Sequence, residues 1–168
     1  MLKATDQDLY SKLDERGIAY EVYEHPPVYT VEEARQHAPV LPGADVKNLF
    51  LRNKKKTQLF LLTVLSDKVV NMKALEDALN VSGRLSFGSA DLLADTLGVS
   101  PGSVTPFAMI NDTAHRVSFY MDNDIKQSTH IHPHPLRNDR TISLRVVDLI
   151  TFLEQDGHTV NWLGTVNK

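Results

Sequence analysis

Residues 46–65 read VKNLFLRNKKKTQLFLLTVL, two apolar segments separated by a short run of lysines. The segments 46–52 and 58–65 have the composition of two strands, and the lysine-rich residues between them are typical of a turn. The second segment is apolar on both faces, as expected for a strand with a neighbour on each side. This stretch therefore predicts a hairpin near the centre of a sheet.

Helices and further strands are predicted on both sides of this hairpin. Capping residues and apolar repeats predict helices at residues 5–16, from Thr30 to before Pro39, and at 72–79, 89–97 and 146–155. Short apolar stretches predict strands at residues 18–23, 107–110, 117–120, 129–131, 141–145 and 158–163. Several strand pairs are joined by turns too short for a helical crossover. We therefore expect one α/β domain over residues 1–168, with a mixed, largely antiparallel sheet surrounded by helices.

Composition limits the classes of protein. The chain has 168 residues, 42% hydrophobic and 23% charged, which is typical of a globular domain. It has no cysteine, which excludes disulfides, thiolate metal sites and cysteine nucleophiles. Its longest apolar stretch, 59–65, is much shorter than the about 20 residues that span a bilayer. With no signal peptide visible, we expect a cytoplasmic protein without membrane contact.

Charge alone does not indicate a nucleic-acid partner. The formal net charge is −3, whereas nucleic-acid-binding domains are often strongly basic. Residues 52–56 form the one dense cationic cluster, and charge alone favours a solvated turn there.

Lys47 is the first candidate for chemistry. On a regular strand it shares a face with Leu49 and Leu51, so its ammonium could enter a partly desolvated pocket and meet a phosphate, a carboxylate or a polarised carbonyl. A lysine at the end of a strand can equally extend to water, and spacing alone favours that interpretation.

The loop GVSPGSVTP at 98–106 is the second candidate. Its glycines allow close approach of the backbone to a ligand, and successive N–H groups can face developing negative charge. The alternative is a long connection between a helix and a strand.

The third candidate is a histidine cluster, His130, His132 and His134. In an extended chain the three rings lie on one side, which is a possible spacing for a zinc site. The intervening Pro133 and Pro135 disturb a regular strand, and no acidic residue lies close by in sequence. One functional histidine, or ordinary surface histidines, are the competing interpretations, and we expect no metal.

Five stretches together resemble the YbaK/prolyl-tRNA-synthetase-associated domain family. They are EHPPVYTVEEA (24–34), VKNLFLRNKK (46–55), RLSFGS (84–89), GVSPGSVTPFAMIND (98–112) and HPLRNDRTISL (134–144). Their order and spacing match the family over essentially the whole chain. The resemblance implies a freestanding deacylase without a cofactor, most similar to the branch that acts on alanyl-tRNA(Pro). Its partners would be the acceptor end of mischarged tRNA(Pro) and prolyl-tRNA synthetase.

Such an activity has a physical motive. A pocket built for proline discriminates poorly against the smaller alanine, because missing methylenes are worth only about 1–3 kcal/mol. A second, smaller site that admits alanine and rejects proline would correct the error by hydrolysis.

The resemblance also implies roles for individual residues. Lys47 would be central to catalysis, with His134 lining the pocket and Gly102 supplying a backbone contact to the oxyanion. Substrate contacts are implied for Thr30, Asn48, Gly98, Ser100 and Pro101. Contacts to the acceptor stem are implied for Arg52, Lys54, Lys55 and Arg84. Asn48 would face away from Lys47 on a regular strand, which conflicts with a shared site. Water is the expected nucleophile, and His130 and His132 are not motif positions.

Two alternatives remain at this point. A non-catalytic module with the same fold could dock on a synthetase or on RNA, and the histidines could form a metal-dependent hydrolase.

Overall fold

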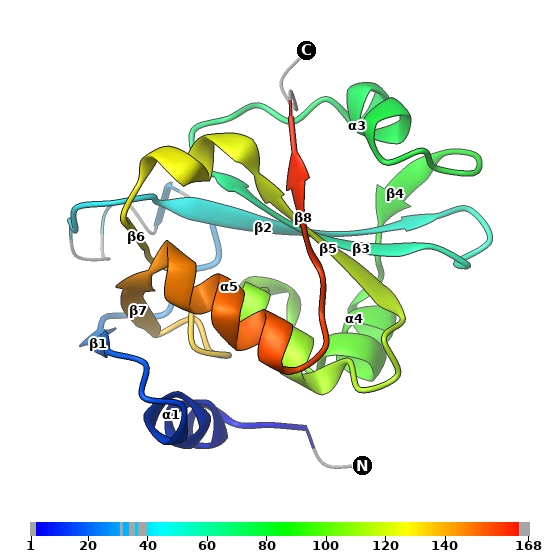
Figure 1. Ribbon diagram of the computed structural model, residues 1–168. Helices are drawn as coiled ribbons and strands as arrows, with labels where there is room; N and C mark the ends of the chain where they lie inside the picture. The colour runs from blue at the N-terminus through cyan, green and yellow to red at the C-terminus, as the bar shows by residue number, and fades with distance from the viewer. Residues whose placement is uncertain (1–2, 31, 34–35, 37–39, 165–168) are drawn as a thin grey trace.

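The predicted hairpin forms the middle of the larger sheet. The protein is described by a computed structural model at residues 3–30, 32–33, 36 and 40–164. Strands β2 (Val46–Asn53) and β3 (Leu59–Leu65) pair antiparallel. As predicted, β3 lies centrally, because β5 (Val117–Asp122) pairs with its other edge in parallel. The short strand β4 (Leu85–Phe87) joins β2, and β8 (Val160–Leu163) joins β5, giving the order β4-β2-β3-β5-β8 (Figure 1).

The remaining strands form a second, three-stranded sheet. Its order is β1 (Tyr20–Glu24), β7 (Arg140–Arg145) and β6 (His130–Ile131), and both pairings are antiparallel. An isolated parallel bridge between Ala44 and Ile131 connects it to the chain just before β2. The expected α/β class and the largely antiparallel pairing are confirmed, but the strands divide between two sheets. Strand β6 is short, and Pro133 follows it without a backbone N–H to extend the pairing.

Capping residues define the helices. Helix α1 (Asp6–Glu15) begins after Thr5, whose side chain and that of Asp8 form a capping box. Asn71 caps α3 (Met72–Ala78), and Ser89 caps α4 (Ala90–Leu97). Helix α5 (Val146–Gln155) has the predicted bounds. Thr30 Oγ1 accepts the Glu33 N–H at 3.1 Å, as the predicted capping box requires, but most of the helix expected before Pro39 lies outside the described residues.

Two local predictions were wrong or incomplete. Residues 107–110, expected as a strand, lie in the 3-10 helix η2 (Pro106–Asn111), with η1 (Pro101–Ser103) before it and η3 (Asn123–Gln127) after β5. Thr105 accepts the Phe107 N–H and Pro106 occupies the first helical position, two helix-start signals in the sequence. Strand β4 was not predicted at all, because three residues are too few for a visible pattern.

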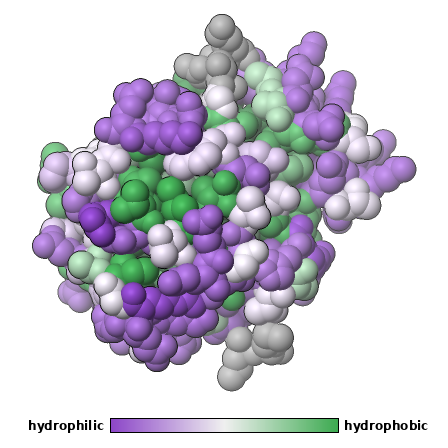
Figure 2. All heavy atoms as spheres, in the orientation of Figure 1, coloured by the Kyte–Doolittle hydropathy of each residue, from purple (hydrophilic) through white to green (hydrophobic). Residues whose placement is uncertain are grey.

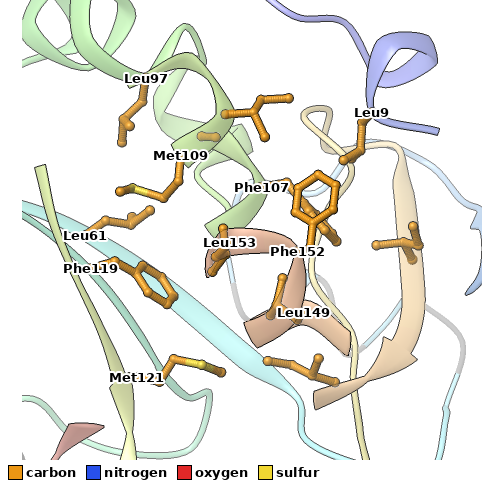
Figure 3. Packing of buried hydrophobic residues seen from close by; sticks show 14 of the residues in the cluster. Leu9, Leu61, Leu97, Phe107, Met109, Phe119, Met121, Leu149, Phe152 and Leu153 are labelled. Carbon is orange, nitrogen blue, oxygen red and sulfur yellow. The ribbon is translucent and has the colours of Figure 1, made fainter. Parts of the chain in front are cut away.

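Two hydrophobic clusters pack on opposite faces of the larger sheet. The larger cluster joins β3 and β5 to α1, α4, α5 and η2, with Phe107 edge-on to Phe152 at 5.7 Å between ring centroids (Figure 3). The smaller cluster lies between the other face and α3, and contains Leu51, Phe60 and Leu75. Each residue of β2 therefore faces one cluster or the other in alternation, which decides where its polar residues point.

The face of the molecule drawn in Figure 2 is mostly hydrophilic. Figure 2 shows hydrophilic side chains over much of this face, with apolar ones gathered between η3 and α5. No helix of the described ranges has the length and apolar character needed to cross a membrane.

Candidate active site

A cavity of about 440 Å³ opens where β2 begins. It brings together six residues that the sequence had singled out, from four separate segments: Thr30, Lys47, Asn48, Pro101, Gly102 and His134. Further polar lining comes from residues not predicted to act there, namely Asp45, Ser66, His132 and Thr141. Apolar walls are provided by Val28, Val40, Val46, Leu49 and Val104, with Tyr29 at one side.

Lys47 and Asn48 both line the cavity although they face opposite sides of β2. Lys47 lies opposite Val64 of the smaller cluster, and its ammonium donates to the carbonyl oxygen of Lys68. Asn48 lies opposite Thr63, whose hydroxyl donates to Asn48 Oδ1 at 2.5 Å. Strand β4 pairs only with the far end of β2, so this end is a sheet edge around which the cavity extends. Both side chains can therefore line the same cavity, although strand alternation directs them to opposite faces of β2.

The two ring nitrogens of His134 differ in their hydrogen bonding. Its Nδ1 lies 2.7 Å from the carbonyl oxygen of Arg140, and because a carbonyl can only accept, Nδ1 carries the hydrogen. Burial lowers the pKa of His134; the Arg140 hydrogen bond opposes this, and the nearby ring of His25 adds to the lowering. The ring is therefore neutral at pH 7. Its Nε2 has a free lone pair and no partner among the described residues.

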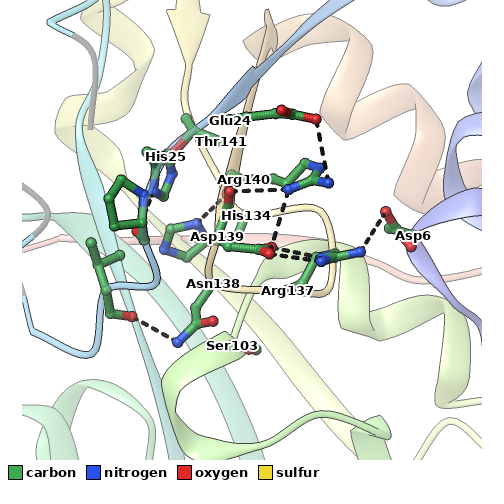
Figure 4. Close-up of polar contacts among 12 residues, drawn as sticks. Asp6, Glu24, His25, Ser103, His134, Arg137, Asn138, Asp139, Arg140 and Thr141 are labelled. Carbon is green, nitrogen blue, oxygen red and sulfur yellow. Dashed lines mark hydrogen bonds and ion pairs between the residues drawn. The ribbon is translucent and has the colours of Figure 1, made fainter. Parts of the chain in front are cut away.

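A hydrogen-bonded loop holds His134 in place (Figure 4). The buried hydroxyl of Thr105 donates to the His134 carbonyl at 2.6 Å. Arg137 forms a bidentate pair with Asp139 at 2.6 and 2.7 Å, and that pair lowers the pKa of Asp139. Asn138 bonds the backbone of Val28 in both directions, at 3.0 and 3.1 Å. The HPLRND residues thus connect the histidine to the wall that carries Val28.

Two other histidines support the cavity. His132, expected to be incidental, is buried and lines the cavity, with Nε2 2.9 Å from the Pro42 carbonyl and Nδ1 3.2 Å from the Asp45 carboxylate. These contacts connect the segment before β2 to the chain that follows β6 of the second sheet. His25 bonds the hydroxyl of Thr141 through Nε2 at 2.8 Å. Only knowledge of the tertiary fold could have identified these contacts.

Fewer residues of the glycine-rich loop line the cavity than expected. Gly102 lies in η1, and a Cβ there would stand 2.8 Å from the ring of Tyr29 and 3.3 Å from the amide of Asn138. Gly98 instead ends α4 with φ +67° and packs against Lys3, away from the cavity lining. Ser100 contacts Ser103 and is likewise not a lining residue. Pro101 and Gly102 are the loop residues placed at the site.

The predicted tRNA-binding residues lie at the far end of β2. Arg52 is five residues from Lys47, roughly 17 Å along a strand. It donates to the carbonyls of Asn53 and Lys54 across the turn. Because Asn53 pairs with Leu85, Arg84 comes to the same end of the sheet. These cations form a cluster separate from the cavity, and Figure 2 shows the turn as a hydrophilic projection.

The three clustered histidines do not form a tripod. His132 uses both nitrogens within the fold, and His134 uses one on Arg140. Across the described ranges, no group of three histidine, aspartate or glutamate side chains is placed to hold a metal ion.

Known proteins are similar to the chain over nearly its whole length. The family described as the aminoacyl-tRNA editing domain matches residues 25–152. Prolyl-tRNA synthetase associated domain-containing protein 1 of Bos taurus is 39% identical over 153 residues, covering 89% of each chain. The prolyl-tRNA editing protein ProX of Acetoanaerobium sticklandii is 35% identical over 153 residues, covering 91% of this chain and 93% of its own.

The fold has solved counterparts too. A crystal structure described as a proposed trans-editing enzyme for prolyl-tRNA synthetase superimposes with a TM-score of 0.68 at 18% identity, over 97% of this chain and 98% of its own. Editing of an aminoacyl-tRNA is deacylation, so the expected enzyme class is confirmed by the family match. The chain belongs to the aminoacyl-tRNA editing domain family.

Proposed function

We propose that this protein hydrolyses the ester of alanyl-tRNA(Pro) in the cavity beside Lys47. One observation carries the proposal: a single cavity of about 440 Å³ combines a lysine ammonium, a neutral histidine nitrogen and apolar walls. That volume is in the lower part of the range for ligand pockets, about 300–1,000 Å³. Valine and leucine side chains on the walls suit the methyl group of alanine.

Lys47 and His134 would divide the binding of the aminoacyl end. The Lys47 ammonium gives one hydrogen to the Lys68 carbonyl and keeps two for the ester carbonyl or the terminal phosphate. The free Nε2 of His134 would accept a hydrogen bond from the substrate's α-ammonium group, its ribose or the attacking water. Both groups are held by the fold, so they cost little reorganisation on binding.

The chemical step needs only water. A water molecule attacks the carbonyl carbon, and the negative charge on the tetrahedral oxygen would be stabilised by Lys47 and by the Gly102 N–H. The ester bond then breaks, the ribose oxygen takes up the proton that the attacking water has lost, and alanine leaves as the free amino acid. Gly102 fits this role because its N–H has no partner in the described part of the chain.

The rest of the tRNA would extend along β2. Tyr29 and Val40 are 70% and 97% exposed at the cavity, and a stacked base would cover apolar surface there. Beyond them, Arg52, Lys54 and Arg84 would contact phosphates of the acceptor stem. Prolyl-tRNA synthetase, which appears in the names of the relatives, is the proposed source of the mischarged substrate.

The test is release of labelled alanine from alanyl-tRNA(Pro) by the pure protein. We expect release much faster than in buffer, with prolyl-tRNA(Pro) left intact. Seryl- and cysteinyl-tRNA(Pro) in parallel define the preferred amino acid. A protein that binds alanyl-tRNA(Pro) but leaves its ester as stable as buffer does would contradict hydrolysis and support the non-catalytic module. Activity lost on chelation and restored by zinc would instead support the metal hydrolase.

A further inference from the structure

The loop between β3 and α3 supplies the fixed contact to the proposed catalytic lysine. The Lys47 ammonium donates to the backbone carbonyl of Lys68, while Ser66 of the same loop lines the cavity. The Ser66 N–H also donates to the carbonyl of Asp45 at 2.9 Å. The position of this loop therefore determines where the ammonium lies.

The side chain of Lys68 anchors the loop to the sheet. Its ammonium lies 2.7 Å from Asp122 Oδ1 and 2.7 Å from Asp124 Oδ2. The Asp122 side chain is fully buried, and it also accepts the N–H of Leu65 at 3.2 Å and of Asp124 at 3.0 Å. Burial acts to lower the pKa of Lys68, but the two carboxylates outweigh it and raise the pKa, so the side chain stays charged.

Three elements meet through this anchor. Asp122 ends β5, which runs parallel to β3, so its carboxylate lies beside the residue where β3 ends. The side chain of Lys68 binds that carboxylate, and the backbone carbonyl of Lys68 accepts the hydrogen bond from Lys47 on β2. A series of contacts thus leads from the buried Asp122 carboxylate through Lys68 to the Lys47 ammonium at the cavity.

We propose that Lys68 and Asp122 are positioning residues for Lys47. Lysine has a flexible four-carbon chain, and an ammonium without a fixed acceptor would sample several rotamers. The anchored carbonyl takes one of its hydrogens and leaves the other two aimed at the ligand, which is the geometry that the proposed hydrolysis needs. The inference rests on the proposed role of Lys47, so its test includes a measurement independent of activity.

The first test is a double-mutant cycle with alanyl-tRNA(Pro). Lys68→Met alone should lower kcat/KM about tenfold, whereas in a Lys47→Ala protein it should have no further effect, because the two residues act as one unit. Lys68→Arg, which retains the cation, should recover most of the activity. Lys73→Met, an exposed lysine of α3, controls for loss of a charge. An equal loss in both backgrounds would show a merely structural role and overturn the inference.

The second test follows the Lys47 amine directly. An acetylating reagent is applied briefly, and the acetylation rate of Lys47 is compared with that of exposed Lys54 in the same sample by mass spectrometry. We expect Lys68→Met and Asp122→Asn to raise the relative rate at Lys47 several-fold, and Lys73→Met to leave it unchanged. An unchanged rate in the first two variants would overturn the inference even if the protein hydrolyses the ester. If wild-type protein fails to hydrolyse any aminoacyl-tRNA while the rates change as expected, the anchor stands and the proposed function falls.

Discussion

Thr105→Val removes the hydrogen bond that holds the backbone of His134 in the candidate active site. The Thr105 side chain is fully buried, and its hydroxyl donates to the His134 carbonyl at 2.6 Å. Valine has nearly the same shape, so the change removes the donor without opening a cavity. It leaves a carbonyl oxygen without its partner in a part-buried position.

The expected cost follows from that geometry. A buried polar group that loses its partner costs about 1–3 kcal/mol, and the secondary bond to the Phe107 N–H, at 3.4 Å, adds little. For a chain of this size each kcal/mol lowers the melting temperature by about 2–4 °C. Because the lost bond fixes the backbone of His134, we also expect kcat/KM to fall about tenfold or more.

Two measurements check the prediction. Urea denaturation gives the change in unfolding free energy, and alanine release from alanyl-tRNA(Pro) gives kcat/KM. Thr105→Ser is the matched control: it keeps the donor and should keep the activity, losing only the packing of one methyl, about 0.8 kcal/mol. If Thr105→Val proves as active as wild type while remaining equally stable, the hydrogen bond does not position His134 and our reasoning fails.

Four further predictions concern pH, the two loop glycines and the basic turn. Burial lowers the pKa of His134, so its ring is neutral at pH 7. Both kcat/KM and the stability contributed by this neutral ring should fall as pH drops through the lowered pKa; a pH–rate profile that stays flat down to the pH at which the protein unfolds contradicts this. Gly102→Ala should lower kcat/KM about tenfold at a cost of less than about 1 kcal/mol in stability, because the new methyl meets an exposed tyrosine ring at 2.8 Å beside the cavity. Gly98→Ala should leave kcat unchanged but cost about 1–2 kcal/mol or more in urea denaturation, because φ is +67° and the new methyl would stand 2.8 Å from the buried amide of Asn111. Lys54→Glu with Lys55→Glu should raise KM and flatten its dependence on salt while leaving kcat alone, and an unaltered salt dependence would remove the turn from the tRNA interface.

The sequence predicted those parts of the fold that are decided locally. Asn71 and Ser89 each cap a helix where expected, because the signal lies within four residues of the helix start. The β2–β3 hairpin was visible because its apolar segments flank a polar turn. In contrast, residues 107–110 are buried on all sides in η2, and a short apolar run has no period that separates a helix from a strand.

The site was predictable only in part. Lys47, Gly102 and His134 were proposed through a family resemblance, and the structure places them around one cavity. The resemblance implied that Lys47 and Asn48 share a site, but strand alternation alone argued against it, because their shared placement depends on β4 covering only the far end of β2. His132 and the Lys68 anchor were missed for a similar reason: their partners, Asp45 and Asp122, lie 87 and 54 residues away in sequence.

The most direct test of the account is single-turnover release of alanine from alanyl-tRNA(Pro) by wild-type protein, Lys47→Ala and the exposed control Lys73→Ala. Loss of one group that stabilises the transition-state charge typically costs about 10²–10³ in rate. We predict that loss for Lys47→Ala and a wild-type rate for Lys73→Ala, with both variants folded by circular dichroism. A folded Lys47→Ala protein that releases alanine as fast as wild type would contradict the central claim.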